Sequence, residues 1–277
     1  MKNYQGKFCL ALSPTFNLSE QEQLEKFASH KIDGFFAIYK DYNQVANLKE
    51  IADKKGLFFQ SLHAKHHPMR EIWFDGDKTD YIMSDLKESI VSCSKVGVDR
   101  LIMHLYTGFT DEKPNDIGIK RVGELLELAK KHGVYLCFEN LEGTDFLDAV
   151  LTEYSACDNA RFCYDTGHEN CYATHAVVDK HKDKITALHI NDNLGIRNKD
   201  KTLSGLDDMH LLPFDGNVDF DRVISLIKHA NLQNELTFEF KFSKDPLSDK
   251  YRALSFDEYL DLAKTRMLRL AKMIVDK

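Results

Sequence analysis

The sequence lacks any long uninterrupted hydrophobic stretch. No run approaches the roughly 18 apolar residues that span a membrane, and the apolar run at 8–12, which Ser13 and Pro14 end, is too short for a signal peptide. Lys and Arg number 37 against 44 Asp and Glu, so no basic excess attracts nucleic acid or an anionic membrane. These absences predict a cytoplasmic protein without a membrane partner. They also argue against a nucleic-acid partner and leave a homo-oligomer open.

Two kinds of short signature are also missing. The six cysteines include no Cys-x-x-Cys pair, and three of them, Cys9, Cys137 and Cys163, fall in apolar runs where a free thiol behaves as a small hydrophobe. We therefore expect a reducing compartment rather than a disulfide framework. The chain carries no Gly-x-Gly-x-x-Gly or phosphate-loop motif, and no domain linker, low-complexity tract or simple repeat.

What the chain does have is a regular alternation of strand-like and helix-like segments. Two helix ends are marked locally: Ser19 with Glu22 forms a capping box, and Gly56 suits a left-handed C-cap. Strands are expected at 7–13, 33–39, 57–64, 100–106, 134–141, 161–166, 184–191 and 236–241. Helices are expected at 19–30, 43–55, 79–96, 116–132, 145–157, 219–230 and 256–275, with a weaker helical stretch at 174–181.

This alternation predicts parallel strands joined by crossover helices. Eight such units in 277 residues match an α/β fold of the (β/α)8 TIM-barrel type, as a single domain over 1–277. The alternative is a doubly wound open sheet, which no glycine-rich phosphate-binding motif supports.

The active site of a barrel lies at the C-terminal ends of its strands, and six consecutive strands end in a side chain that can bind a metal. A lone histidine in such a strand is often an ordinary core residue, but a glutamate inside an apolar strand is costly without a cation. Six such residues converging on one mouth therefore indicate a site. They are His63, His104, Glu139, Asp165, His189 and Glu239.

Two stretches could add further ligands. In 161–170 an apolar strand ends at Asp165, and His168 follows across a turn at Gly167. The alternative is that Asp165 only caps the next helix and His168 lies on the surface. In the polar loop 192–216, Asp208 and His210 alternate, so both could turn inward, although a solvated acidic loop reads the same way.

Taken together, these motifs resemble the xylose-isomerase-like TIM-barrel superfamily, and in particular its sugar phosphate isomerase/epimerase members. The resemblance runs from about residue 61 to 241, and no single motif carries it alone. The matching segments are 61–64, 138–140, 164–168, 188–192, 210–219 and 238–239.

The resemblance implies one divalent metal held by Glu139, Asp165, His189 and Glu239. One nitrogen and several oxygens suit Mn2+ or Zn2+ first, with Mg2+ or Co2+ as alternatives. It implies an isomerase or epimerase of a sugar or sugar phosphate, in which a metal-stabilised enediolate forms by proton transfer and Glu139 and Glu239 are the catalytic pair.

The small-molecule sugar would be bound by further polar side chains near the metal. The resemblance implies His63, His104 and His168 as contacts, and Arg197, in the loop after His189, could hold a hydroxyl or a phosphate unless it is a plain surface residue.

The same superfamily contains endonuclease IV, a three-zinc enzyme that cuts abasic DNA. Its ligand pattern is similar to nine residues here, so a zinc-dependent phosphoester hydrolase is the alternative function. A third possibility is a non-catalytic barrel or one with a different reaction, for instance a dehydratase of a polyol or inosose. The additional metal ligands would then be His63, His104, His168, Asp208 and His210.

Overall fold

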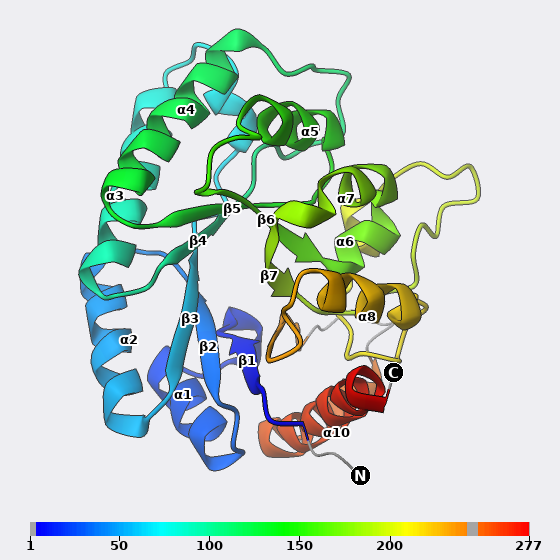
Figure 1. The fold of residues 1–277 in the computed structure, drawn as a ribbon. Coiled ribbons are helices and arrows are strands. Elements are labelled where there is room, and N and C mark those ends of the chain that lie inside the picture. The colour runs from blue at the N-terminus through cyan, green and yellow to red at the C-terminus, as the bar shows by residue number, and fades with distance from the viewer. Residues whose placement is uncertain (1–3, 243–248, 277) are drawn as a thin grey trace.

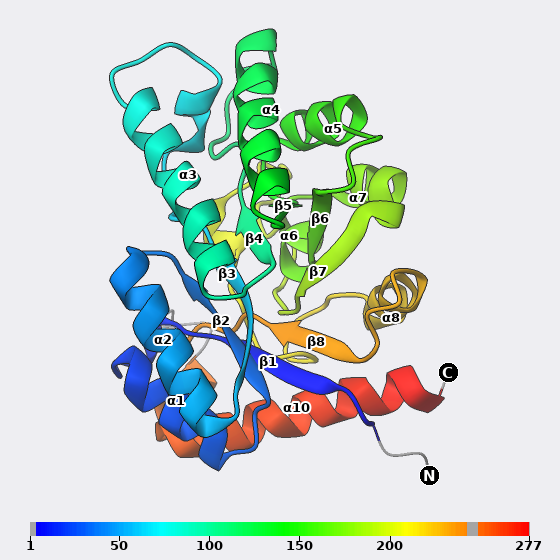
Figure 2. The same ribbon diagram turned by 60° about the vertical axis from the view of Figure 1, so that its left-hand side comes forward.

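Eight parallel strands form an inner ring, and helices surround it (Figures 1 and 2). The computed structural model describes residues 4–242 and 249–276. The strands lie in the order β7-β6-β5-β4-β3-β2-β1-β8, and a parallel bridge from Ile190 to Phe238 joins β7 to β8. The predicted (β/α)8 barrel is therefore confirmed. The strands are β1 (Lys7–Ala11), β2 (Gly34–Ile38), β3 (Phe58–His63), β4 (Arg100–Met103), β5 (Tyr135–Glu139), β6 (Ala160–Asp165), β7 (Ile185–His189) and β8 (Glu235–Phe238).

The helices follow the predicted order, and their local signals act as expected. Ser19 and Glu22 make the capping box of the first helix, and Gly56 ends the second with a φ of 66°. The helices are α1 (Glu20–Ser29), α2 (Tyr42–Lys55), α3 (Thr79–Lys95), α4 (Asp116–Lys131), α5 (Thr144–Glu153), α6 (Thr166–Cys171), α7 (His175–His181), α8 (Phe220–His229), α9 (Asp249–Arg252) and α10 (Phe256–Asp276).

The structure corrects the sequence prediction at several places, among them α9, which was not expected, and β4, which ends at Met103 rather than at 106. α6 begins directly after β6 and was not expected, because its residues have weak helix propensity. α5 ends at Glu153 rather than at 157. β8 ends at Phe238, so Glu239 lies just beyond the strand, where its backbone N–H donates to Ile190 O at 3.1 Å.

The hydrophobic core lies mainly between the strands and the helices, and a smaller cluster of Ile102, Cys137, Cys163 and Ala187 fills the ring interior. All six cysteines are free, and five of them are buried. Because successive side chains of a strand alternate, Cys137 and Glu139 share a face, with the apolar cluster below and the carboxylate above. The core thus supports a polar mouth from beneath.

In the part of the chain that the structure describes, no helix is long and apolar enough to span a membrane.

Candidate metal centre

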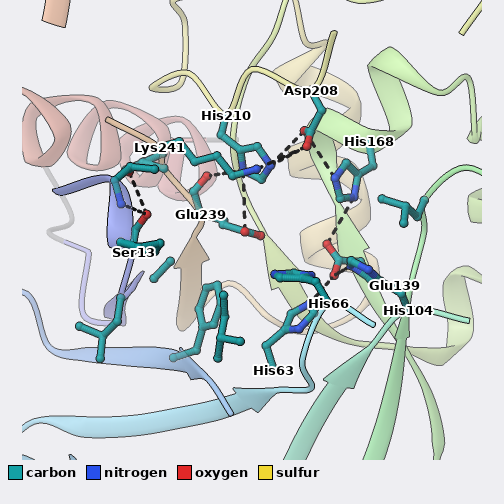
Figure 3. A pocket seen from close by; sticks show the side chains of 18 residues that line it. Ser13, His63, His66, His104, Glu139, His168, Asp208, His210, Glu239 and Lys241 are labelled. Carbon is teal, nitrogen blue, oxygen red and sulfur yellow. Dashed lines mark hydrogen bonds and ion pairs between the residues drawn. The ribbon is translucent and has the colours of Figure 1, made fainter. Parts of the chain in front are cut away.

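Most of the predicted site residues meet at the C-terminal mouth of the ring, in or beside the wall of one cavity of about 350 Å³ (Figure 3). Apolar side chains, including Phe36 and Leu141, form part of its wall. The polar lining residues are Ser13, Thr15, His63, His66, His104, Glu139, His168, Asp208, His210, Glu239 and Lys241.

Four residues form what we call the central cluster: Glu139, Asp165, His189 and Glu239. Each offers one ligand atom, and these atoms lie within 4.8 Å of one another. His189 Nδ1 is 3.0 Å from Glu139 Oε1 and 3.0 Å from Glu239 Oε2. The His189 ring is held by stacking on Phe36, with ring centroids 4.5 Å apart. The structure thus brings together all four predicted metal ligands.

Asp165 caps α6 and also belongs to the central cluster, so the two interpretations that the sequence offered do not exclude each other. Its Oδ1 accepts the backbone N–H of His168 at 2.6 Å and caps α6. Its Oδ2 accepts Asn191 Nδ2 at 2.7 Å. His168 is buried rather than on the surface, because α6 turns it into the cavity. Capping therefore fixes the carboxylate in the cluster and does not replace that role.

The charges of the central cluster call for a cation. Burial raises the pKa of Asp165 to about 6; the positive field of His168 opposes this, and Glu139 adds to it. Burial would also raise the pKa of Glu139, but the surrounding imidazoles, His189 first, hold it well below the usual value. Three carboxylates, two of them buried and that of Glu239 partly buried, form with one imidazole a donor set that suits Mn2+, Zn2+, Mg2+ or Co2+. These residues fit a divalent metal.

A second cluster, the three-histidine group, consists of His63, His66 and His104, and its ligand atoms also lie within 4.8 Å of one another. His63 Nε2 and His104 Nε2 each lie 3.2 Å from Glu139 Oε2. Burial and the neighbouring imidazoles lower the pKa of His66 to about 3, which keeps its ring neutral and able to bind a metal. The sequence prediction missed His66, although it follows His63 by three residues in a histidine-rich segment.

A third cluster, the Asp208 group, consists of His168, Asp208 and His210. His210 Nε2 lies 3.0 Å from Asp208, and His168 Nε2 lies 3.5 Å from Asp208 Oδ1. Burial opposes ionisation of Asp208, yet His210, His168 and Lys241 hold its pKa well below the usual value. The loop alternation at 208–210 therefore does point both side chains inward.

Arg197 is the predicted site residue that the structure places outside both the cavity wall and the three clusters. Its Nε donates to Asp207 Oδ1 at 2.6 Å, and its guanidinium also donates to Leu206 O. It is not among the residues that line the cavity. Arg197 instead folds back on its own loop, where it pairs with the buried carboxylate of Asp207, the residue before the cavity-lining Asp208.

The fold and the site together define a TIM-barrel protein with a carboxylate–histidine cluster at its mouth, whose donor atoms fit a divalent cation. The family model described as "Xylose isomerase-like TIM barrel" matches residues 24–256. The chain belongs to this family, which confirms the resemblance found in the sequence.

Individual relatives are more distant. The uncharacterized protein y4fM of Sinorhizobium fredii is 34% identical over 127 residues, which are 45% of this chain and 35% of that protein. The structure of the IOLI protein with a binding zinc atom has a TM-score of 0.73 at 18% identity, over 97% of this chain and 99% of that one. The 3-keto-D-glucoside 4-epimerase of E. coli has a TM-score of 0.68 at 14% identity, over 94% and 99%.

Proposed function

We propose that this protein is a metal-dependent isomerase or epimerase of a sugar or sugar phosphate. The central cluster carries the proposal, because it places two glutamates and a metal-competent donor set beside a cavity large enough for a monosaccharide. The structural similarity to a 3-keto-D-glucoside 4-epimerase and to a zinc-containing protein of the same fold supports it.

Glu139, Asp165, His189 and Glu239 would hold the metal. A divalent ion there would polarise a substrate carbonyl and offset the negative charge that develops when a neighbouring carbon loses a proton. The same ion would also offset the repulsion among these three carboxylates, of which two are buried.

Glu139 and Glu239 are the proposed acid–base pair. Both line the cavity, and the pKa of each is held below its usual value, against burial, mainly by His189 for Glu139 and by His210 and His189 for Glu239. Both are therefore carboxylates near neutral pH, and either can accept a proton from carbon. If the other glutamate first takes a proton from water or from a substrate hydroxyl and delivers it to the opposite face of the same carbon, the reaction is an epimerisation; if a proton is delivered to the adjacent carbon, it is an isomerisation.

The histidines at the wall would position the sugar. His168 Nδ1 lies 2.9 Å from Asn140 O, which leaves Nε2 directed at the cavity side near Asp208. His63 and His104 face Glu139 from the opposite wall. These imidazoles are suited to hydrogen bonds with hydroxyl groups on both sides of the glutamate pair.

Two measurements test the proposal. Metal analysis of the purified protein should find an ion that is lost from a variant in which Asp165→Asn and His189→Ala are combined. The protein should then exchange solvent deuterium into a member of a panel of ketoses and ketose phosphates, and Glu239→Gln should stop the exchange. Metal binding without exchange into any member of a broad panel would contradict proton-transfer chemistry.

The alternative is a zinc-dependent phosphoester hydrolase of the endonuclease IV type acting on abasic DNA. The observation that favours it is the presence of the three-histidine group and the Asp208 group beside the central cluster. Three zinc ions per chain, together with incision of an abasic duplex at low enzyme concentration, would establish it in place of the isomerase.

A further inference from the structure

Lys241 lies at the wall of the cavity, next to the Asp208 group. Glu239 and Lys241 are alternate residues of the extended chain that leaves β8, so both side chains point to the mouth (Figure 3). The backbone of this segment is fixed, because Lys241 N–H donates to His210 O at 3.2 Å. The Lys241 ammonium then reaches Asp208 Oδ2 at 3.5 Å.

The Asp208 group differs from the central cluster in its balance of carboxylates and imidazoles. The central cluster has three carboxylates for its one imidazole, whereas the Asp208 group has one carboxylate for two imidazoles. Of the cavity-lining residues that the structure describes, Lys241 is the only lysine or arginine, and its positive charge pairs with that one carboxylate. The Asp208 group therefore already contains the cation that its charge requires.

We propose that Lys241 is a built-in counter-cation that excludes metal from the Asp208 group and leaves that group to position the substrate. A divalent ion bound by His168, Asp208 and His210 would have to share Asp208 with an ammonium ion a few ångströms away. Like charges at that separation repel strongly in a partly buried site. Placing the substrate against this wall rests on the proposed function, but the exclusion of metal does not.

The proposal adds a residue to the comparison with the three-zinc hydrolases. The nine residues that match the endonuclease IV ligand pattern all lie in the three clusters. In one of these clusters, however, Lys241 prevents metal binding although it is not itself a ligand. Lys241 would then present an ammonium ion to a substrate hydroxyl or carbonyl oxygen at the side of the cavity where Asp208 lies. A metal count made from the ligands alone would overestimate the number of ions.

Zinc stoichiometry of the full-length protein tests the proposal. Metal-free wild type, Lys241→Met and Lys241→Arg are equilibrated with Zn2+, and the bound zinc is counted. Methionine keeps much of the side-chain volume without the charge, and arginine keeps the charge. Lys241→Met should bind one more zinc per chain than wild type. The affinity of its Asp208 group for zinc should be about 100-fold higher than that of the same group in the wild type. Lys241→Arg should match wild type.

The double variant Lys241→Met with His210→Ala locates the added ion, because it should lose the extra zinc and keep the rest. Thermal unfolding checks that each variant is folded. Equal zinc counts in wild type and Lys241→Met would overturn the proposal, as would loss of a zinc from wild type on His210→Ala alone. Absence of zinc from the central cluster would instead contradict the proposed function, so the two failures are distinguishable.

Discussion

Replacing Gly167 by alanine should destabilise the protein and weaken metal binding together. A Cβ added to Gly167 would lie 1.9 Å from Asn191 Oδ1 and 2.9 Å from its Cγ. Asn191 is fully buried and cannot simply rotate away, because its Nδ2 donates to Asp165 Oδ2 at 2.7 Å and its backbone N–H donates to Thr166 Oγ1 at 3.0 Å. Relief of the clash therefore has to move a side chain that orients a proposed metal ligand.

The magnitude follows from two contributions. Overpacking of a tight core typically costs about 1–3 kcal/mol, and a lost hydrogen bond to a charged acceptor costs about 1.5–3 kcal/mol. A total of about 3 kcal/mol would lower the midpoint of thermal unfolding by about 5 °C in a chain of this size. Disturbing a residue that orients a metal ligand should also weaken zinc binding about 10–100-fold.

Differential scanning calorimetry and zinc titration measure the two effects. The matched control is Gly205→Ala, since a Cβ there meets nothing within 4 Å and the backbone φ of Gly205 is not positive. The control should unfold and bind zinc as wild type does. If Gly167→Ala also matched wild type in both measurements, the reasoning about Asn191 would be refuted.

Three further outcomes are expected. Glu239→Gln should abolish turnover and weaken zinc binding by at least about 100-fold in a zinc titration, because it removes a charge from the central cluster; retained activity on the true substrate would contradict the role of Glu239. In the metal-free protein the folded state binds the Asp165 proton more tightly than the unfolded state does, because folding raises the pKa of Asp165 to about 6. The free energy of unfolding should therefore fall as the pH is raised from about 4 to 6. Zinc affinity should rise over the same range, because zinc binds the deprotonated carboxylate. Affinity that is flat across this window would be the contrary result. Arg222→Met removes the guanidinium that lies 2.7 Å from the buried Glu169 carboxylate. This change should lower the free energy of unfolding, measured in urea, by about 3 kcal/mol. Removing the charge of the exposed Lys113 should lower it by less than about 1 kcal/mol.

Most of the fold could be predicted from the sequence because the apolar periodicity is strong in the strands. The capping box at Ser19 and the C-cap at Gly56 are local signals, because each depends only on residues close by in the sequence. α6 has no such signal: its only visible cue is Asp165, which serves at the same time as N-cap and as a member of the central cluster. Because either role alone explains an aspartate at this position, the sequence does not show that Asp165 has both.

The site was predictable where strands carry it and less so where loops do. Glu139 and His189 follow from strand alternation, since each lies at the end of a buried strand. The position of His66 depends on the path of the loop after β3, and the turning back of Arg197 depends on its bond to Asp207. Lys241 shows the same limit, because its importance comes from a neighbour 33 positions away in the chain.

The ring has a seam, and the central cluster lies across it. β7 and β8 are joined by the bridge from Ile190 to Phe238, and Glu239 N–H donates to Ile190 O just above it. His189 belongs to one side of this seam and Glu239 to the other. An ion bound by both residues would link β7 to β8 at the place where the barrel closes. We therefore expect zinc to slow amide hydrogen exchange at Ile190 and Glu239 more than at strands β3 and β4 on the far side of the ring, so that metal binding and closure of the barrel become one equilibrium.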